Sequence, residues 1–482
     1  MIVVGAGPVG LMLAAELGLA GVRALVLDRL DEPTGQSRGL GFTARAMEVF
    51  DQRGLLPRFG APVGVPAGHF GGLPMDFSVL RDAHFGARGV PQAVTERILA
   101  DRAAELGVIV RRGADVVGLA ADEDGVEVFF EDATGTHRVA ASYVVGCDGG
   151  RSTIRELAGF DFPGTPATCE MFLADVSGCD VTARFIGERV PGGMVMAAPL
   201  DGDVHRIIVC ERGTPPRRRS GPPAFAEVAA AWQRLTGQDI SRAQARWVSA
   251  FTDATRQVTQ YRRGRVLLAG DAAHVHLPAG GQGLSLGVQD AVNLGWKLAA
   301  EVDGWAPAGL LDSYHDERHP VGAKVLRNTR AQGLLYLSGA EVDPLRAVMA
   351  DLIELPEVGR HLAGMVSGLD IRYDCGPGDH PLLGRRLPPD ELVARHGAVH
   401  TAELLHAGRA VLLDLADDPA LAAAVAGWAD RFDVVTAKAS AQDRFADTAA
   451  LLVRPDGHVV WASPAGGDLD SALRRWFGAP RE

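Results

Sequence analysis

Short apolar runs alternate with glycine-containing turns and an amphipathic segment at the start of the chain. "MIVV" at 1–4 predicts a buried strand, and "LMLAAELGLA" at 11–20 carries apolar residues at helical spacing. "VRALVLD" at 22–28 predicts a second strand. A strand, a helix and a strand in this order predict a βαβ unit, and therefore a parallel sheet.

The next part of the chain continues with helices and strands of ordinary length. "TARAMEVFDQRGL" at 43–55 predicts an amphipathic helix with Thr43 as its N-cap, and "PQAVTERILADRAAELGV" at 91–108 predicts another helix. "GVEVFF" at 125–130 alternates as a half-buried strand does. "YVVGCDGGRSTIREL" at 143–157 reads as strand, turn and helix.

From 165 to 260 the pattern changes to short alternating runs. "GGMVMAAPL" at 192–200 and "HRIIVCE" at 205–211 predict strands of an antiparallel sheet. "RVLLAGDAAH" at 265–274 then returns to the buried-strand style of the beginning. The sheet is therefore expected as an insertion between two halves of the first domain.

The C-terminal part begins after "GPGDHPLLGRRLPP" at 376–389, which predicts a linker. A small α/β unit follows, and "ALLVRPDGHVVWA" at 450–462 predicts a hairpin around Asp456-Gly457. The expected division is an α/β first domain at 1–164 and 261–375 (with 64–95 contributing to a pocket), a sheet domain at 165–260, the linker at 376–389 and a C-terminal domain at 390–482.

Composition narrows the class of protein. The chain has 482 residues, of which 47% are hydrophobic and 22% charged, as in an ordinary globular protein. Its formal net charge of −12 argues against a broad nucleic-acid surface, which needs clustered Lys and Arg. No apolar run approaches the length of roughly 18 residues that a membrane span needs. We therefore expect no nucleic-acid partner and no membrane partner.

The cysteines carry no recognisable metal or disulfide pattern. They lie at 147, 169, 179, 210 and 375, and no two of them form a CxxC pair. An odd number without paired spacing favours neither a disulfide framework nor a zinc site. We expect no metal and a reduced, cytoplasmic compartment.

The segment "GAGPVG" at 5–10 has the spacing of a dinucleotide-binding turn. Gly5 permits the tight turn, Gly7 lets the backbone approach a pyrophosphate, and Gly10 lets helix and strand pack closely. Asp28 follows Gly10 by 18 residues (28 minus 10), near the spacing of an acidic side chain that binds a ribose. A glycine-rich packing turn is the alternative, and the motif does not separate FAD from NAD.

A second glycine-rich loop follows the strand at 265–269, within "LAGDAAHVHLPAGGQGLSLGVQDAVNLGWKL" at 268–298. The strand delivers Gly270-Asp271 to its carboxyl end, where open α/β sheets bind ligands. The free N–H groups of the helix that follows favour an anion or a developing negative charge. A cap at the start of that helix is the alternative role for Asp271.

"GAGPVG", "CDGGRS" at 147–152 and "GDAAHVHLPAGGQG" at 270–283 together resemble the flavoprotein aromatic hydroxylases, single-component FAD-dependent monooxygenases related to para-hydroxybenzoate hydroxylase. The resemblance covers about residues 1–370. "SRGLGFTARAMEVFDQRG", "HFGGLP" and the C-terminal unit are similar to the polyketide-tailoring branch, which hydroxylates polycyclic aromatics such as angucyclines.

The resemblance implies a Rossmann-like FAD-binding domain, an inserted antiparallel-sheet substrate domain and a thioredoxin-like C-terminal domain, which here lacks a CxxC pair. It implies non-covalent FAD, NADPH or NADH as a transient reductant, O₂ as co-substrate, and hydroxylation of a polycyclic aromatic polyketide through a flavin C4a-hydroperoxide. No second GxGxxG opens a βαβ unit, so no dedicated NADPH domain is expected. The family implies a monomer or homodimer.

Because the cofactor carries the hard step, no protein catalytic residue is expected. The resemblance places Asp271 on the ribityl chain, Asp148 on the pyrophosphate, and Pro278 and Gly281 near the flavin ring. The full cofactor set is Gly5, Gly7, Pro8, Gly10, Asp28, Arg29, Arg38, Gln92, Asp148, Gly149, Gly270, Asp271, Pro278, Gly280, Gly281, Gln282, Gly283 and Leu284. For Arg38 and Gln92, a surface or core-capping role is the alternative. The expected substrate pocket is His69, Phe70, Phe77, Met194, Met196 and Pro199.

One residue departs from the family pattern, since Ser285 stands where many relatives have Asn. Serine is shorter, so we expect one flavin-side contact to be lost or bridged by water. Two alternative functions remain open: another flavin reaction such as oxidation, halogenation or Baeyer–Villiger oxygenation, and a non-catalytic flavin- or ligand-binding protein. Lysine occurs only at 297, 324 and 438, which weakens the halogenase version because those enzymes carry a tunnel-facing lysine.

Overall fold

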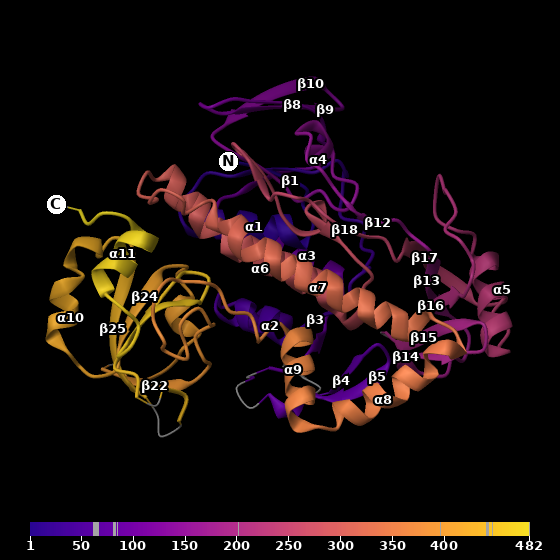
Figure 1. Cartoon of the computed structure of the whole chain (residues 1–482). Helices are drawn as coiled ribbons and strands as arrows, with labels where there is room; N and C mark the ends of the chain where they lie inside the picture. The colour runs from indigo at the N-terminus through magenta and orange to yellow at the C-terminus, as the bar shows by residue number, and fades with distance from the viewer. Residues whose placement is uncertain are drawn as a thin grey trace.

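The computed structural model describes residues 1–60, 67–80, 83, 85–200, 202–395, 397–439, 443–445 and 447–481. Part of the 64–95 segment that was expected at the pocket, namely 64–66, 81, 82 and 84, lies outside the described residues. Figure 1 shows the long helices α6 and α7 running through the middle, the C-terminal elements at the left and a large sheet with α5 at the right.

A mostly parallel six-stranded sheet forms the centre of the molecule. Its order is β19-β20-β11-β1-β2-β7, and only the β19–β20 pair is antiparallel. The bounds are β1 Ile2–Val4, β2 Leu25–Leu27, β7 Ile109–Arg111, β11 Val144–Gly146, β19 Arg262–Arg263 and β20 Val266–Leu268. The βαβ prediction is confirmed, because β1 pairs in parallel with β2. The three sequence motifs follow β1, β11 and β20, which are neighbours in this sheet.

Helices pack around this sheet and extend beyond it. α1 packs against α3 and α6, and α2 also contacts α6. The helix after Thr43 is confirmed, with Thr43 at its N-cap. The bounds are α1 Pro8–Leu19, α2 Ala44–Asp51, α3 Gln92–Glu105, α4 Thr153–Leu157, α6 Gln282–Val302, α7 Ser313–Leu337, α8 Asp343–Ile353 and α9 Pro356–Ser367.

Four small sheets complete the first part of the chain. β8 Asp115–Ala121, β9 Val126–Asp132 and β10 Gly135–Ala141 form the antiparallel sheet at the top of Figure 1. β12 Gly164–Thr165, β18 Thr255–Gln257 and β21 His274–Val275 form another. β3 Gly41–Phe42 pairs with β6 Arg88–Gly89, and β4 Ala67–Phe70 pairs with β5 Leu73–Asp76.

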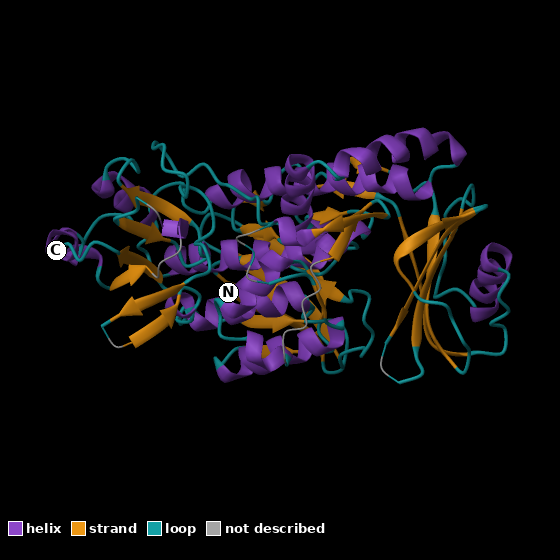
Figure 2. Ribbon diagram, turned by 90° about the horizontal axis from the view of Figure 1, so that it is seen from below, coloured by secondary structure: helices purple, strands orange, loops and turns teal. Residues whose placement is uncertain are grey.

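The inserted segment forms a five-stranded antiparallel sheet in the order β14-β15-β16-β13-β17. One face packs on α5 (Phe225–Thr236) through an apolar cluster that contains Val195, Ile207 and Trp232. The bounds are β13 Glu170–Ser177, β14 Arg184–Val190, β15 Gly193–Pro199, β16 His205–Glu211 and β17 Gln244–Thr252. All five strands fall inside the segment expected for an antiparallel sheet, and Figure 2 shows the sheet with its helix at one end of the molecule.

The C-terminal sheet has the strand order β23-β22-β25-β24-β26-β27. β24 is parallel to β25 and antiparallel to β26, and β26 pairs antiparallel with β27, the arrangement of a thioredoxin-like unit. The predicted hairpin is confirmed, with Asp456-Gly457 in the turn between β26 and β27. The bounds are β22 Glu391–Ala394, β23 Gly397–His400, β24 Ala410–Asp414, α10 Pro419–Ala424, β25 Phe432–Ala439, β26 Ala450–Val453, β27 Val459–Ser463 and α11 Leu469–Phe477.

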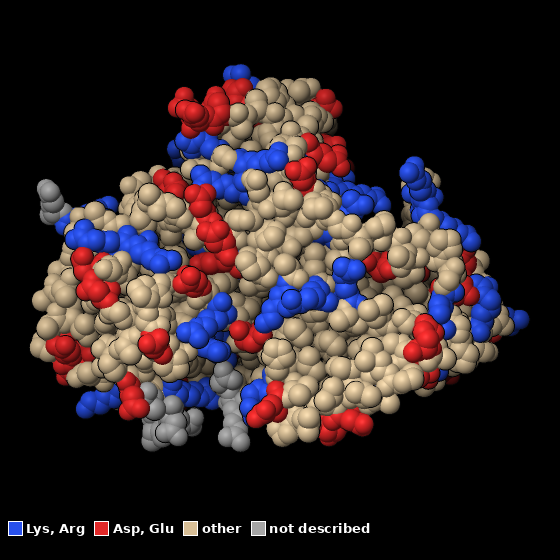
Figure 3. Space-filling model, in the orientation of Figure 1, with Lys and Arg blue, Asp and Glu red and all other residues tan. Residues whose placement is uncertain are grey.

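Surface charge is mixed on the face that Figure 3 shows. Acidic and basic side chains are interspersed there in small groups, without one continuous basic field. Among the residues that the structure describes, no helix combines the length and apolar character needed to cross a membrane.

Candidate active site

A cavity of about 930 Å³ lies where the carboxyl ends of β1, β11 and β20 meet. One end is lined by the glycine turn after β1, the Asp148 segment and the loop after β20. The other end reaches the five-stranded sheet, where Met171, Leu173 and Met194 face it. The three sequence motifs are therefore brought to one cavity, which also touches the inserted sheet.

The glycine turn after β1 leaves backbone open to the cavity. Gly5 has φ +102°, and a Cβ there would lie 2.5 Å from the carbonyl oxygen of Cys147. Gly7 is the N-cap of α1, no side chain caps it, and a Cβ there would meet nothing within 4 Å. The free N–H groups at the start of α1 can therefore bind an anion such as a pyrophosphate.

Asp28, at the end of β2, closes the glycine turn. Its Oδ2 accepts a hydrogen bond of 2.6 Å from the Ala6 N–H, and its Oδ1 accepts one of 2.9 Å from the Leu30 N–H. Asp28 also lines the cavity, together with the exposed side chains of Arg29 and Arg38. The carboxylate thus holds the turn in shape and still faces the space where a ribose would lie.

Asp148 is bound to the start of α4. Its Oδ1 accepts a hydrogen bond of 2.5 Å from the Ser152 hydroxyl, and its Oδ2 accepts one of 3.1 Å from the Ile154 N–H. Burial raises the pKa of Asp148, although these hydrogen bonds act against that rise. The adjacent Gly149 has φ +80° and lines the cavity with open space around its Cα.

Gln92 connects α3 to the segment that carries Arg38. Its Oε1 accepts a hydrogen bond of 3.2 Å from the Gly39 N–H, and its Nε2 donates one of 2.8 Å to Glu96. Gln92 therefore holds the segment at Gly39 through this hydrogen bond and also lines the cavity.

The loop after β20 presents Asp271 and the start of α6. Asp271 and Pro278 are exposed on the cavity wall, and Gly280, Gly283 and Leu284 line it half-buried. Gly281 is the N-cap of α6 with φ +64°, and no side chain caps the helix. The first N–H groups of α6 therefore face a place where negative charge would be stabilised.

Three residues of the expected cofactor set do not line the large cavity. A Cβ at Gly10 would lie 1.9 Å from the Gly5 oxygen, so Gly10 serves the close approach of helix and turn. Gly270 packs on Val9, where a Cβ would come within 2.9 Å. Gln282 is turned toward α7, where its Oε1 accepts a hydrogen bond of 3.1 Å from Asn328.

The structure brings only half of the residues expected at the substrate pocket to the large cavity. His69, Met194 and Met196 line the cavity, but Phe70 and Phe77 are buried in a separate apolar cluster with Leu73 and α9. The reason is strand alternation, because His69 and Phe70 are consecutive in β4 and face opposite sides. Pro199 lies exposed at the end of β15, on the face opposite to Met194 and Met196.

A polar pair stands among the apolar side chains of the cavity. The Tyr336 hydroxyl lies 3.1 Å from His69 Nδ1, and it donates a hydrogen bond to the Ile186 carbonyl oxygen. Burial lowers the pKa of His69 to about 4 and raises the pKa of Tyr336. His69 is therefore neutral at neutral pH and can exchange a hydrogen bond with a hydroxylated ligand.

Sequence reasoning missed several lining residues. Met171, Leu173 and Ile208 lie on strands whose alternation could have identified them. Tyr336 and Phe251 gave no signal, since only the fold brings the end of α7 and β17 to the same cavity.

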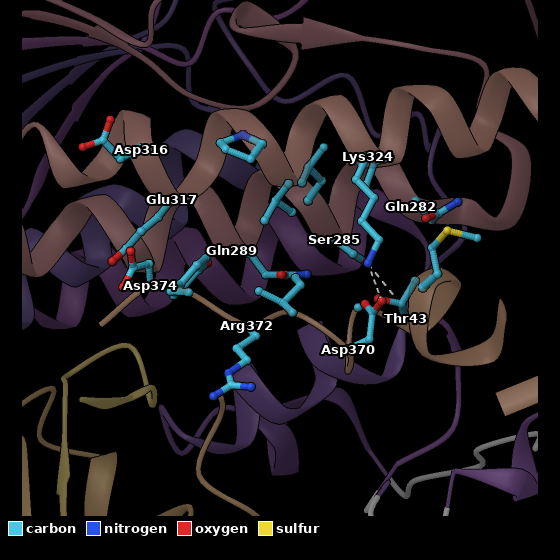
Figure 4. Close-up of a pocket in the computed structure, with 18 of the residues that line it drawn as sticks. Thr43, Gln282, Ser285, Gln289, Asp316, Glu317, Lys324, Asp370, Arg372 and Asp374 are labelled. Carbon is cyan, nitrogen blue, oxygen red and sulfur yellow. Dashed lines mark hydrogen bonds and ion pairs between the residues drawn. The ribbon is translucent and has the colours of Figure 1, made fainter. Parts of the chain in front are cut away.

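Ser285 belongs to a second cavity of about 750 Å³ between α6, α7 and residues 368–374. Its hydroxyl accepts a hydrogen bond of 2.9 Å from the Thr43 N–H, and Ser285 is absent from the wall of the large cavity. The expectation of a lost flavin-side contact is thus replaced by a contact between α6 and the start of α2. Figure 4 shows Thr43 and Ser285 close to the Lys324–Asp370 ion pair; Thr43 lines both cavities.

These features fit FAD. Two helix N-termini without side-chain caps face one cavity, and glycines with open space around them leave room for a pyrophosphate and a flat ring. Gly5, Gly7, Asp28, Asp148 and Asp271 could hold its dinucleotide part.

Comparison with known proteins agrees with this fit. A family model described as "FAD binding domain" matches residues 1–329, and one described as "Aromatic-ring hydroxylase, C-terminal" matches residues 380–480. A curated relative from Streptomyces rimosus, 12-dehydrotetracycline 5-monooxygenase/anhydrotetracycline 6-monooxygenase, is 46% identical over all of this chain and 99% of its own.

Two further relatives bear on the range of functions. The solved structure of CabE, an aromatic hydroxylase from angucycline biosynthesis, has a TM-score of 0.97 and 61% identity and covers 100% of this chain and 99% of that one. Dialkyldecalin synthase from Streptomyces rugosporus is 41% identical over 99% of this chain and 98% of its own. The chain is an enzyme that belongs to the FAD-dependent aromatic-ring hydroxylases, a family of flavoprotein monooxygenases.

Proposed function

We propose that the protein hydroxylates a polycyclic aromatic polyketide of the angucycline type, with FAD as cofactor, NADPH or NADH as transient reductant and O₂ as co-substrate. The observation that carries the proposal is the continuity of the large cavity, which joins the glycine-rich cradle to the apolar face of the inserted sheet. A flat aromatic ring bound at the apolar end of such a cavity would lie beside a flavin bound in the cradle. The similarity to CabE supports the angucycline class.

The chain's own groups bind and orient in this proposal. Uncapped N–H groups of α1 hold the pyrophosphate, and Asp271 accepts hydrogen bonds from the ribityl chain. The uncapped N-terminus of α6 would stabilise negative charge on a flavin ring bound next to it. When bound, the flavin would supply the redox chemistry, in which NAD(P)H gives two electrons, one oxygen atom of O₂ enters the aromatic ring and the other leaves as water.

The apolar end of the cavity orients the substrate and excludes water. Met194, Met196 and Phe251 offer a wide apolar contact to a polycyclic ring system. His69, neutral because its pKa is lowered to about 4, accepts a hydrogen bond from a phenolic hydroxyl, with Tyr336 fixing the imidazole. Exclusion of water favours transfer of oxygen to the ring over loss of peroxide.

A second candidate function rests on one of the relatives. A relative that is 41% identical to this chain is named a dialkyldecalin synthase, and that name does not describe an oxygenation. Under that candidate the protein binds FAD and a polycyclic ligand, but the ligand does not accelerate oxidation of NAD(P)H.

The test is oxidation of NADPH and NADH by the FAD-loaded enzyme with and without candidate polycyclic phenols. We expect yellow protein that releases FAD on denaturation, and faster oxidation when a substrate is present. A protein that takes up no FAD would refute both candidates. FAD uptake without acceleration by any aromatic would favour the second candidate, and acceleration that yields only peroxide would refute hydroxylation.

A further inference from the structure

We propose that the C-terminal region is part of the machinery that binds FAD, because a buried network fixes the loop carrying Asp271 from behind. Asp290, Arg318 and Tyr373 are its positioning residues, and the hairpin turn 454–458 is its anchor. The proposal rests on the FAD site of the proposed function, but not on the substrate.

The network begins at Asp290 on α6, which is fully buried. Its Oδ2 accepts a hydrogen bond of 3.1 Å from the Gly270 N–H and lies 2.7 Å from His274 Nε2. Gly270 and His274 flank Asp271, so one carboxylate grips the cavity loop on both sides of the residue that faces the cavity. Burial alone would raise the pKa of Asp290, but Arg318 and His274 lower it, and the carboxylate stays charged.

Arg318 on α7 joins Asp290 to two other parts of the molecule. Its Nε donates a hydrogen bond of 2.7 Å to Asp290 Oδ1, and its Nη2 donates one of 3.1 Å to the Leu286 carbonyl oxygen. Leu286 lies in the second turn of α6, close to the helix start that faces the cavity. The third contact is a hydrogen bond of 2.9 Å from Nη1 to the Tyr373 hydroxyl, beyond the helices.

Tyr373 passes the network to the C-terminal hairpin. Its ring lies 4.4 Å from the His458 ring, measured between centroids, and the guanidinium of Arg454 lies 5.4 Å from the Tyr373 ring centroid. Arg454 also donates hydrogen bonds to Glu317 on α7 and to Asp456. Asn293 on α6 donates a hydrogen bond of 3.2 Å to Asp456. The hairpin turn is therefore held between the same two helices that hold the cavity loop.

Burial makes this network consequential. Arg318 and Arg454 are 0% exposed, and each is matched by a buried carboxylate. A buried donor or acceptor that loses its partner still pays its desolvation cost, so removal of a single polar atom destabilises the neighbouring contacts of the network. Because the network ends on the Gly270 N–H, loss of one of its hydrogen bonds should also loosen the loop that carries Asp271.

Asp290→Asn tests the proposal at the loop. An amide cannot accept hydrogen bonds from Gly270 and His274 while also accepting from Arg318 on its other side, whichever way it is turned. We expect the FAD dissociation constant, measured by quenching of flavin fluorescence below the unfolding transition, to rise about tenfold or more.

Tyr373→Phe tests the connection to the C-terminal region with a smaller change. It removes only the hydroxyl that accepts from Arg318 and keeps the ring against His458, so the protein should fold. We expect the FAD dissociation constant to rise about threefold. This variant keeps the proposal testable if Asp290→Asn does not fold.

Leu413→Ala is the matched control. Leu413 is buried in a cluster made only of C-terminal residues and is not itself a member of the network, although Val453 and Val459 of that cluster flank the turn 454–458. We expect it to lower the unfolding midpoint while the FAD dissociation constant stays at the parent value. The proposal is overturned if Asp290→Asn and Tyr373→Phe bind FAD as tightly as the parent, or if Leu413→Ala weakens FAD binding as much as Tyr373→Phe. Failure of the parent itself to bind FAD would instead refute the proposed function.

Discussion

Among the residues that line the large cavity, Asp28, Asp148 and Asp271 come from the sequence motifs, and their carboxylates are engaged to different degrees. Asp28 accepts hydrogen bonds from the N–H groups of Ala6, in the glycine turn after β1, and of Leu30, and Asp148 accepts from Ser152 and Ile154 at the start of α4. Asp271 is exposed on the cavity wall. A carboxylate whose oxygens remain available is the better acceptor for a ligand, so Asp271 should contribute most to binding and Asp148 most to local structure.

Substitution by alanine separates these two roles. Asp271→Ala should raise the FAD dissociation constant about tenfold and change the unfolding midpoint little, because the Asp271 side chain is exposed on the cavity wall. Asp148→Ala should lower the free energy of unfolding by about 1 kcal/mol, because the Ser152 hydroxyl and the Ile154 N–H lose their acceptor, and should weaken FAD binding less. Titration with FAD and thermal unfolding of both variants measure this, and equal FAD affinities would contradict the ribityl role of Asp271.

His69 predicts an acid-dependent loss of stability. Its pKa is about 4 in the folded protein and 6.5 ordinarily, because burial disfavours the charged ring. Between pH 6.5 and 4 the unfolded chain therefore binds a proton that the folded protein excludes, so the free energy of unfolding falls as the pH falls.

The variant His69→Gln removes this titration. We expect the free energy of unfolding of the parent to fall more steeply between pH 6.5 and 4 than that of the variant, by up to about 1.4 kcal/mol per pH unit. His458, whose pKa is also lowered to about 4, contributes equally to both proteins. Chemical denaturation at several pH values measures the slopes, and parallel slopes would show that His69 does not titrate this way.

At the scale of elements, the junction between α6 and α2 defines the wall between the two cavities. Ser285 on α6 accepts a hydrogen bond from the Thr43 N–H at the N-cap of α2, and Thr43 touches both cavities. The contact satisfies a buried donor at a helix start, where backbone N–H groups have no partner inside their own helix. Its role is to fix two helices against each other.

Ser285→Ala should therefore act on stability. It leaves the Thr43 N–H without its partner, and we expect the free energy of unfolding to fall by about 1–2 kcal/mol. FAD affinity should change less than twofold, because Ser285 is not on the wall of the large cavity. Urea unfolding measures the free energy of unfolding, and FAD titration of the same preparation measures the affinity. A large loss of FAD affinity at unchanged stability would instead indicate that Ser285 contacts the flavin.

Elements were predictable from the sequence where local chemistry decides them. The strand–turn–helix around Gly5 and the hairpin at Asp456-Gly457 follow from glycine's backbone freedom and apolar patterning. The direction of side chains was less predictable. Phe70 points away from the cavity because of its position in the alternation of β4, and Gln282 does so because it hydrogen-bonds to Asn328 on α7. Tyr336 could not be found, since its nearness to His69 depends on tertiary structure alone.

At the scale of the whole molecule, three regions distant in sequence enclose or support one site. The parallel sheet supplies the cradle, the inserted sheet supplies the apolar wall, and the C-terminal hairpin is joined to the helices behind the cradle. The sequence motifs indicated the first of these directly. The buried network between Asp290 and Asp456 was invisible in the sequence, because its members carry no local pattern and meet only through the packing of α6, α7 and the C-terminal unit.

Isotopic labelling shows directly whether the enzyme transfers one oxygen atom from O₂ to an aromatic ring. The FAD-loaded enzyme is supplied with NADPH and a polycyclic phenol under ¹⁸O₂, and the product is analysed by mass spectrometry and NMR. We expect one labelled oxygen in a new ring hydroxyl. Label in a ring-expanded ester would indicate Baeyer–Villiger oxygenation, and a product without label, or no product with every substrate tried, would refute aromatic hydroxylation.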